Sequence, residues 1–331
     1  MRFRTLGPSG LQASIVGLGT WPLGGGSVWG GAPDETLSIR TIQAAIDVGV
    51  NLIDTAPAYG FGESERVVGR AIRGRRQQVL LATKCGLWWQ DRRGAFFGPF
   101  DGKRLFRSLR KETLQIELED SLRRLGVETI DLYQVHWPSA EPDRTPIEET
   151  MDCLQRFRQA GKIRAIGVAN PSVNELRTYV DCGAVTCQAR WNLLWRQVRQ
   201  DLLPFCRTRG VGFLGWAALE QGLLTGQVGL DRTFEPKEYR SNYVWNPWFH
   251  PDQRPRVLGL LDRWQDLTAK YACTLAQLAI AWAVSQAGVS AALCGARSPD
   301  QAMENAAAGD LELAAEDLQR IESDLDALGG V

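Results

Sequence analysis

The chain has 331 residues, and its 38 Lys and Arg are balanced by 38 Asp and Glu. This balance provides no long-range field that would gather nucleic acid or an anionic membrane, so a small, roughly neutral partner is expected. No apolar run approaches the roughly 18 residues that span a bilayer, and residues 1–10 lack the apolar core of a signal peptide, which predicts a soluble, cytoplasmic protein.

The seven cysteines form no Cys-x-x-Cys pair and lie mostly in apolar segments. This pattern is typical of reduced, buried thiols. We therefore expect neither a disulfide nor a zinc or other metal site.

The first predicted element is a β-hairpin over residues 1–13, which turns at residues 7–10 and is expected to plug the lower end of the fold. Eight short, apolar and often β-branched runs follow, as is typical of parallel strands buried on both faces. In chain order they are Ile15–Gly19, Asn51–Asp54, Gln78–Lys84, Ile130–His136, Ile163–Ala169, Thr186–Trp191, Gly212–Ala217 and Ala291–Gly295.

Segments with helical periodicity separate these strands. Apolar residues three and four positions apart predict helices over 39–46, 114–125 and 151–157. Thr145 to Glu148 is interpreted as a capping box, and Gly126 and Gly161 stand where glycines end helices. Eight β/α units without a linker predict an α/β fold, a single (β/α)8 TIM barrel domain over 1–331 with long loops at its C-terminal face.

A glycine-rich stretch after the first of the eight strands suggests an alternative fold. "GLGTWPLGGG", residues 17–26, partly matches the phosphate-binding fingerprint of a doubly wound dinucleotide domain. That fingerprint needs a third glycine that leads into a helix. Pro22 occupies this position and helical periodicity resumes only near Asp34, so the barrel is favoured.

Four residues with ionisable side chains lie at or just after the ends of consecutive predicted strands. Asp54, Lys84 and His136 each end a strand, and Tyr59 follows in the loop after Asp54. A phenol, with a pKa of ~10, is a weak acid, but a nearby ammonium favours the phenolate and is expected to lower that pKa, and a carboxylate keeps the ammonium charged. With a histidine to orient the substrate oxygen, the set predicts a proton donor for a carbonyl that receives hydride.

Each of these residues also has a structural interpretation when taken alone. Tyr59 would be a loop aromatic, Asp54 a turn cap and His136 a satisfied strand histidine. Lys84 would be a solvated charge, or the Schiff-base lysine of an aldolase barrel. The argument for chemistry depends on their joint placement.

At these residues the sequence resembles the aldo-keto reductase family, and the resemblance covers nearly the whole chain. The matching motifs are "NLIDTAPAYGFGESERVVGRAI" (51–72), "LLATKCG" (80–86), "IDLYQVHWP" (130–138), "GKIRAIGVAN" (161–170), "GLLTG" (222–226) and "GARSPDQAMEN" (295–305). The resemblance implies that the family's catalytic tetrad falls on Asp54, Tyr59, Lys84 and His136. It also implies reversible reduction of an aldehyde or ketone to an alcohol, in the manner of the bacterial branch that handles small aldehydes, sugars and polyols.

The resemblance further implies a nicotinamide cofactor that lies across the barrel mouth without a dinucleotide domain. Asn170 and Gln188 match the residues that hold the carboxamide, and Trp216 matches the aromatic residue on which the nicotinamide stacks. Strand-end capping and core packing are the alternative interpretations of these three. Ala169 stands where the family usually has Ser, so one hydrogen bond is expected to be missing.

The last motif is expected to hold the phosphate and adenine end of the cofactor. After Gly295, Ser298 to Gln301 is interpreted as a capping box whose helix start binds phosphate. Arg297 is expected to pair with an adenosine 2′-phosphate and Asn305 matches the family's adenine contact, which favours NADP(H). NAD(H) remains the alternative because Gln301 occupies a position where many relatives carry Arg.

Ten of the twelve tryptophans lie at strand ends or in the loops that follow them, at positions 21, 29, 88, 89, 137, 191, 195, 216, 245 and 248. Loops are ordinarily polar, so this bias favours an aromatic-walled substrate pocket over loop packing. Trp21, Trp29, Trp88 and Trp137 are the candidate walls, and they suit a sugar ring or an aromatic aldehyde. A regulatory subunit of the same fold, like potassium-channel β subunits, is the competing function, and we expect a monomer or small homo-oligomer.

Overall fold

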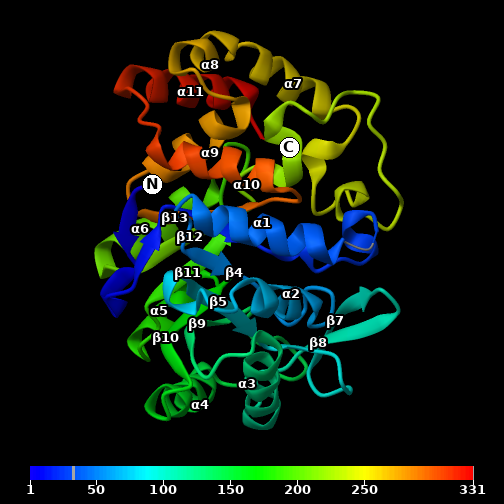
Figure 1. Ribbon diagram of the computed structural model, residues 1–331, viewed down its shortest axis with the longest axis vertical. Coiled ribbons are helices and arrows are strands. Elements are labelled where there is room, and N and C mark those ends of the chain that lie inside the picture. The colour runs from blue at the N-terminus through cyan, green and yellow to red at the C-terminus, as the bar shows by residue number, and fades with distance from the viewer. Residues whose placement is uncertain (32–33, 331) are drawn as a thin grey trace.

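A closed barrel of eight parallel strands forms the centre of the computed structural model, which describes residues 1–31 and 34–330 (Figure 1). The strands are β3 (Val16–Gly19), β4 (Leu52–Asp54), β5 (Leu80–Cys85), β9 (Ile130–Val135), β10 (Ile163–Ala169), β11 (Thr186–Arg190), β12 (Gly212–Trp216) and β13 (Val289–Gly295). Each pairs with the next in chain order, and β13 pairs with β3 to close the ring. The prediction of a (β/α)8 barrel and of its eight strands is confirmed.

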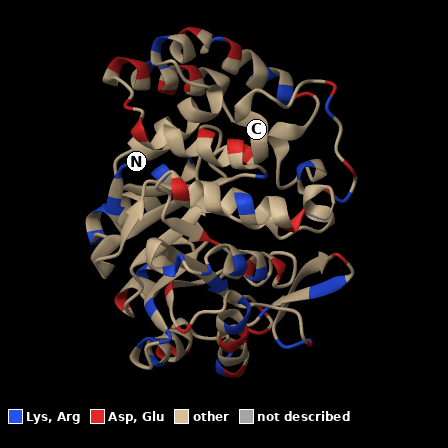
Figure 2. Ribbon diagram, viewed as in Figure 1, with Lys and Arg blue, Asp and Glu red and all other residues tan. Residues whose placement is uncertain are grey.

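Helices surround the barrel, and residues of both charges are spread along them (Figure 2). They are α1 (Glu35–Asp47), α2 (Glu63–Ala71), α3 (Lys111–Leu125), α4 (Ile147–Gln159), α5 (Val173–Asp181), α6 (Leu202–Arg209), α9 (Leu275–Ser285) and α10 (Pro299–Ala307), with α7 (Arg254–Asp262), α8 (Gln265–Tyr271) and α11 (Ala315–Leu328) at one end of the molecule. The three helices predicted from periodicity are confirmed as α1, α3 and α4. Within the described residues no single helix is long and apolar enough to cross a membrane; α8 and α9 pass that test only as a pair bent by 81°.

The N-terminal hairpin consists of β1 (Phe3–Thr5) and β2 (Gln12–Ser14) and closes the lower end of the barrel, as predicted. Leu6 and Leu11 of this hairpin pack in the same apolar cluster as the lower interior side chains of the strands. Gly7 has a φ of +53°, and a Cβ there would lie 2.5 Å from the carbonyl oxygen of Val185. The close approach of the turn to the barrel floor therefore depends on glycine.

The predicted capping box at the start of α4 is wrong. Pro146 is itself the N-cap residue, and no side chain caps the helix. The helix therefore starts one residue too late for Thr145, whose carbonyl oxygen instead accepts a hydrogen bond from Ser139 Oγ at 2.8 Å. Gly126 does end α3 in a left-handed conformation, and Gly161 follows α4 with a φ of +75°.

Long segments at the C-terminal ends of the strands form the rim of the barrel, as expected. The segment after β5 contains a small antiparallel sheet of β6 (Leu87–Trp88), β7 (Ala95–Phe100) and β8 (Lys103–Arg107). Asp101, in the turn between β7 and β8, accepts a hydrogen bond from the backbone N–H of Ser27 at 3.1 Å. This contact joins the rim segment after β5 to the one after β3.

One buried carboxyl lies outside the barrel, between α3 and β5. Glu117 is 3% exposed, and its Oε2 accepts a hydrogen bond from the Gly86 N–H at 2.9 Å. Its Oε1 has no hydrogen-bond partner among the described residues. Loss of solvent raises the pKa of Glu117 from 4.5 to about 8, so the folded chain favours the protonated form at neutral pH.

Glu117→Gln is expected to make the protein more stable at alkaline pH. The folded pKa of about 8 lies above the ordinary value of 4.5, so the wild type loses stability as pH rises between them, by ~1.4 kcal/mol per pH unit. The neutral amide has no such cost. Urea unfolding at pH 5 and pH 8 should show that the free energy of unfolding of the variant exceeds that of the wild type by more at pH 8. Glu112→Gln, at an exposed position of α3, is the control and should show no such difference. Parallel pH dependences would contradict the prediction.

Candidate active site

The structure brings Asp54, Tyr59, Lys84 and His136 together at the barrel mouth. Asp54 ends β4, Lys84 lies near the end of β5, and His136 directly follows β9. Lys84 Nζ donates hydrogen bonds to Asp54 Oδ1 at 2.5 Å, to the Thr55 carbonyl oxygen at 2.9 Å and to Tyr59 Oη at 3.2 Å. The rings of Tyr59 and His136 meet edge to face with their centroids 5.7 Å apart. The four side chains thus form one contiguous group.

Burial and charge act in opposite directions on Lys84 and Tyr59. Burial alone would lower the pKa of Lys84, but the Asp54 carboxylate and the Tyr59 oxygen raise it above its usual value, which keeps the lysine charged. Burial raises the pKa of Tyr59, and the opposite effect of Lys84 does not cancel it. The expectation of a lowered tyrosine pKa was wrong because it considered the ammonium and left out the loss of solvent.

His136 is held in its neutral form. Burial, followed by the nearby Lys84 ammonium, lowers the pKa of His136 well below its ordinary 6.5. A neutral imidazole can donate a hydrogen bond to a substrate oxygen without adding charge. The group therefore offers a protonated phenol backed by an ammonium, beside an uncharged hydrogen-bonding ring, which is an arrangement that can transfer a proton to or from an oxygen atom.

Gln134 is a member of this group that sequence reasoning missed. It is fully buried, and its Nε2 donates a hydrogen bond to Asp54 Oδ2 at 3.0 Å. Gln188 donates to the same oxygen at 3.0 Å and to Gln134 Oε1 at 3.1 Å. A signal was available, because the two-residue period of a strand puts Gln134 on the same face as His136.

A cavity of about 730 Å³ opens directly above these residues. Its aromatic lining consists of Trp21, Trp29, Tyr59, Phe61, Phe97, Phe100, Trp137, Trp216, Tyr239 and Trp245. Three of the four predicted wall residues, Trp21, Trp29 and Trp137, are among them. Trp88 is not: it is 1% exposed and its Nε1 donates to Asp91 Oδ1. Leu87, its neighbour in β6, lines the cavity instead, because alternate strand residues face opposite sides.

Asn170, Gln188 and Trp216 all line this cavity. Asn170 Oδ1 accepts a hydrogen bond from Trp216 Nε1 at 2.9 Å, and Asn170 Nδ2 donates to the His136 carbonyl oxygen at 3.1 Å. Asn170 directly follows β10 with a φ of +56°, and its two side-chain hydrogen bonds link the end of this strand to those of β9 and β12. These side chains are therefore fixed in place next to the titratable group.

Gly295, Arg297 and Gln301 line the cavity around the start of α10, and Asn305, further along α10, lines it as well and donates to the Gly295 carbonyl oxygen at 3.1 Å. Ser298 caps α10 by accepting from the Gln301 N–H at 3.3 Å, but does not line the cavity. Gln301 Oε1 accepts from the Arg297 N–H at 2.8 Å, and not from Ser298 as a full capping box requires. Only half of the predicted capping box is present, because the glutamine amide reaches one residue further back.

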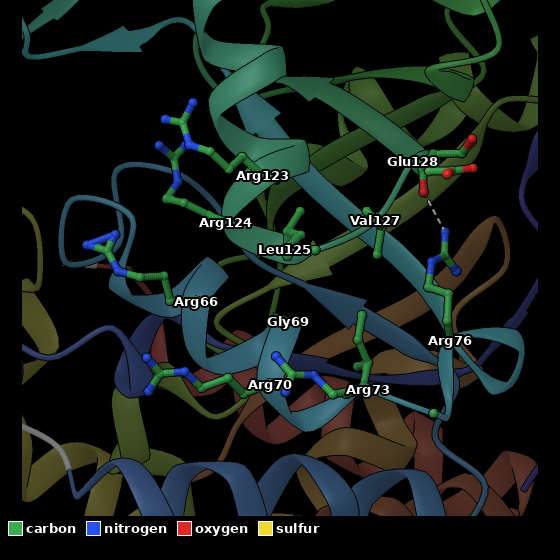
Figure 3. A pocket seen from close by; sticks show the side chains of 14 residues that line it. Arg66, Gly69, Arg70, Arg73, Arg76, Arg123, Arg124, Leu125, Val127 and Glu128 are labelled. Carbon is green, nitrogen blue, oxygen red and sulfur yellow. Dashed lines mark hydrogen bonds between the residues drawn. The ribbon is translucent and has the colours of Figure 1, made fainter.

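A second cavity, of about 900 Å³, lies at the opposite end of the barrel, beside the residues that precede β5 and β9 (Figure 3). Its lining includes Arg66, Arg70, Arg73, Arg76, Arg123 and Arg124. Five of these pair with carboxylates outside the lining, in the pairs Arg66–Glu63, Arg70–Glu35, Arg76–Asp131, Arg123–Asp120 and Arg124–Glu65. Because α2 and α3 both end here, the arginines also offset the negative ends of two helix dipoles. Five of the six arginines are therefore engaged by carboxylates of the same chain.

The cysteines and acidic residues form no further site in the part of the chain that the structure describes. All seven cysteines are free thiols. Within residues 1–31 and 34–330, no group of three or more His, Cys, Asp or Glu side chains is arranged to hold a metal ion.

Comparison with known proteins gives consistent matches along the chain. The sequence model of the aldo/keto reductase family matches residues 15–326. The NADH-specific methylglyoxal reductase of Escherichia coli (strain K12) is 41% identical over 310 residues, which are 93% of each chain. The solved glycerol dehydrogenase AKR11B4 from Gluconobacter oxydans is 37% identical with a TM-score of 0.87, and the match covers 99% of this chain and 96% of that one. An aldo-keto reductase from Klebsiella pneumoniae in complex with NADPH is 26% identical with a TM-score of 0.73, covering 98% and 95%.

The buried Lys84–Asp54 pair is expected to show strong energetic coupling. Lys84→Met or Asp54→Asn leaves one buried charge without its partner, which should lower the free energy of unfolding by roughly 3–5 kcal/mol. The double variant should lose clearly less than the sum of the two. Urea unfolding measures all four proteins, and the exposed pair Lys162–Glu119 provides a control cycle with an expected coupling below about 1 kcal/mol. Additive losses at Lys84 and Asp54 would show that the pair is not coupled.

Proposed function

The chain belongs to the aldo-keto reductase family, and from this premise we propose that it is a nicotinamide-dependent oxidoreductase that reduces an aldehyde or ketone to an alcohol, reversibly. The observation that carries the proposal is the contact of Lys84 Nζ with both Asp54 Oδ1 and Tyr59 Oη at the floor of the cavity. This contact gives the phenol a charged partner at the place where a substrate oxygen would lie.

Tyr59 is the proton donor in the proposed mechanism. When the phenol gives its proton to the carbonyl oxygen, the phenolate that remains lies 3.2 Å from the Lys84 ammonium, which stabilises it. Asp54 keeps Lys84 charged, and the neutral His136 donates a hydrogen bond that positions the carbonyl. The nicotinamide, when bound, supplies hydride to the carbonyl carbon. In the reverse direction the Tyr59 phenolate takes the proton from an alcohol.

The residues along the cavity fit a nicotinamide dinucleotide. Asn170 and Gln188 are proposed to hold the carboxamide, and the Trp216 ring is proposed to stack on the nicotinamide. Gln221 also lines the cavity, and its Oε1 is buried without a hydrogen-bond partner among the described residues. A buried polar atom without a partner costs stability unless a ligand satisfies it, which supports a bound group at this position.

NADP(H) is the proposed cofactor, with NAD(H) as the alternative. Arg297 lines the cavity at the start of α10, where a guanidinium can pair with a 2′-phosphate. The two relatives differ in this respect: the Klebsiella pneumoniae structure is described in complex with NADPH, whereas the Escherichia coli enzyme is named as NADH-specific. The preference therefore has to be tested on this chain.

The proposed substrates are small, neutral carbonyl compounds, including those derived from sugars and polyols. Trp21 stacks on Tyr59 with 5.8 Å between ring centroids and contacts Trp29 edge to face at 5.2 Å, which forms an aromatic wall next to the proton donor. Such a surface packs well on the apolar face of a sugar or a short carbon chain. The names of two relatives, a methylglyoxal reductase and a glycerol dehydrogenase, are consistent with this class.

Two alternatives remain for direct test. An aldolase would need Lys84 as a neutral nucleophile, but the raised pKa of this lysine and its 1% exposure oppose that role. A regulatory subunit would bind the cofactor with little turnover. A panel of aldehydes, ketones and sugars, followed by the loss of the absorbance of NADPH or NADH, separates these functions. Absence of turnover with tight cofactor binding would support the regulatory role, and a borohydride-trapped adduct would support the aldolase.

Tyr59→Phe is expected to abolish turnover because it removes the proton that the substrate oxygen must receive. The kcat should fall by about a thousandfold or more, which is within the usual range for a lost general acid. The Kd of NADPH, measured by fluorescence, should stay within about a factor of two, since the ring is kept. Tyr243→Phe, in the exposed segment after β12, should have wild-type kinetics. Turnover retained in Tyr59→Phe would refute the assignment.

Arg297→Ala is expected to change the cofactor preference. If the guanidinium pairs with the 2′-phosphate, kcat/KM for NADPH should fall about tenfold, the effect of one lost charge-assisted contact, and kcat/KM for NADH should stay the same. Arg73→Ala, in the cavity at the opposite end of the barrel, is the matched control. An unchanged NADPH to NADH ratio would exclude this role for Arg297.

A further inference from the structure

Gln134 completes a buried ring of hydrogen bonds directly below the Lys84–Tyr59 contact. Its Cα is the register partner of Lys84 on the neighbouring strand. Its Nε2 donates to Asp54 Oδ2 at 3.0 Å, and its Oε1 accepts from Gln188 Nε2 at 3.1 Å. Gln188 Nε2 also donates to Asp54 Oδ2, at 3.0 Å. Three side chains from three strands therefore bind one another in a closed set.

Gly167 makes this ring possible. Strand β10 lies between Gln134 on β9 and Gln188 on β11, and Gly167 is the residue of β10 that pairs with Gln134. A Cβ on Gly167 would lie 3.0 Å from Gln134 Cγ and 2.2 Å from Thr186 Oγ1. The missing side chain lets the Gln134 amide cross β10 and reach Gln188.

The ring gives the two oxygens of Asp54 different partners. Oδ1 accepts from the Lys84 ammonium, whereas Oδ2 accepts two N–H groups from neutral amides. Hydrogen bonds to a carboxylate stabilise its ionised form. Two of them on Oδ2 also fix the plane of the carboxylate, so that Oδ1 faces Lys84 Nζ. Without them the carboxylate could turn in its plane, and Oδ1 would no longer be held against Lys84 Nζ.

We propose that Gln134 is a positioning residue that keeps Asp54 directed at Lys84, and thereby controls how readily Tyr59 gives up and regains its proton. The inference rests on the proposed reductase function and adds a residue to its machinery. Gln134 acts through Asp54, since it is fully buried and does not line the cavity. Its effect therefore falls on proton transfer and not on substrate contact.

The first test is Gln134→Leu, which keeps similar volume but removes the amide. The kcat for carbonyl reduction is expected to fall roughly 10- to 100-fold, as for other small misplacements of a catalytic group, while the Kd of NADPH changes less than about threefold. In alcohol oxidation Tyr59 must be deprotonated. If Asp54 turns away, Lys84 loses the carboxylate that keeps it charged and stabilises the Tyr59 phenolate less. The pH at which kcat for alcohol oxidation reaches half of its maximum, the pH midpoint, should therefore rise by about half a unit or more. A space-filling role would leave this midpoint unchanged.

The second test is Gln134→Glu, whose carboxyl can donate to Asp54 only while it is protonated. Its kcat is expected to approach that of the wild type at the acid end of the pH range and to fall as pH rises, since two adjacent carboxylates cannot both be ionised without cost. Gln115→Leu, at an exposed position of α3, is the control for substitution as such. Thermal unfolding confirms that each variant is folded, and if Gln134→Leu is not, the pH dependence of Gln134→Glu decides alone.

The outcomes separate this inference from the proposed function. If the wild type shows no carbonyl-dependent oxidation of NADPH or NADH, the proposed function fails and the inference fails with it. If the wild type is active but Gln134→Leu keeps its kcat and its pH midpoint, only the inference is overturned. A shifted midpoint in Gln134→Leu, together with acid-dependent activity in Gln134→Glu, supports it.

Discussion

The rest of the site depends on the ion pair between Lys84 and Asp54. Lys84 is 1% exposed and Asp54 3%, and two charges withdrawn from water in this way are costly unless each is fully hydrogen-bonded. The surroundings meet this requirement, since Lys84 also donates to the Thr55 carbonyl oxygen and Asp54 also accepts from two amides. Such a set can be held only by rigid strand ends that face one another, which a closed parallel barrel provides.

Most of the fold could be predicted because barrel strands are marked by local patterns. Nearly all residues of the eight runs are buried, so their apolar character shows in the sequence without knowledge of their neighbours. The titratable group could also be placed, because Asp54, Lys84 and His136 interrupt these apolar runs at their C-terminal ends. The start of a helix is harder to predict to the residue, as Thr145 shows: a shift of one residue in the helix start removes a side-chain cap.

The features that sequence reasoning missed depend on contacts between residues far apart in the chain, or on effects of opposite sign on one pKa. The contact between Gln134 and Gln188 exists because Gly167, on the strand between them, has no side chain. The burial of Trp88 follows from which face of β6 meets the cavity, which is decided by its pairing with β8. The raised pKa of Tyr59 is a balance between loss of solvent and the charge of Lys84, and residue types alone do not give its sign.

The aromatic walls of the cavity come mostly from rim segments, whereas the residues that support Tyr59 from below come from barrel strands. Trp21, Trp29 and Tyr239 belong to rim segments, whereas Lys84 and Gln134 belong to barrel strands. Rim segments tolerate substitution and insertion far better than buried strands do. In evolution, a gene copy can therefore change the walls of its cavity while it keeps the hydrogen-bonded set of Lys84, Asp54 and Gln134 on the strands. The shape of the cavity and the buried hydrogen-bonded set beneath it can thus change independently of each other.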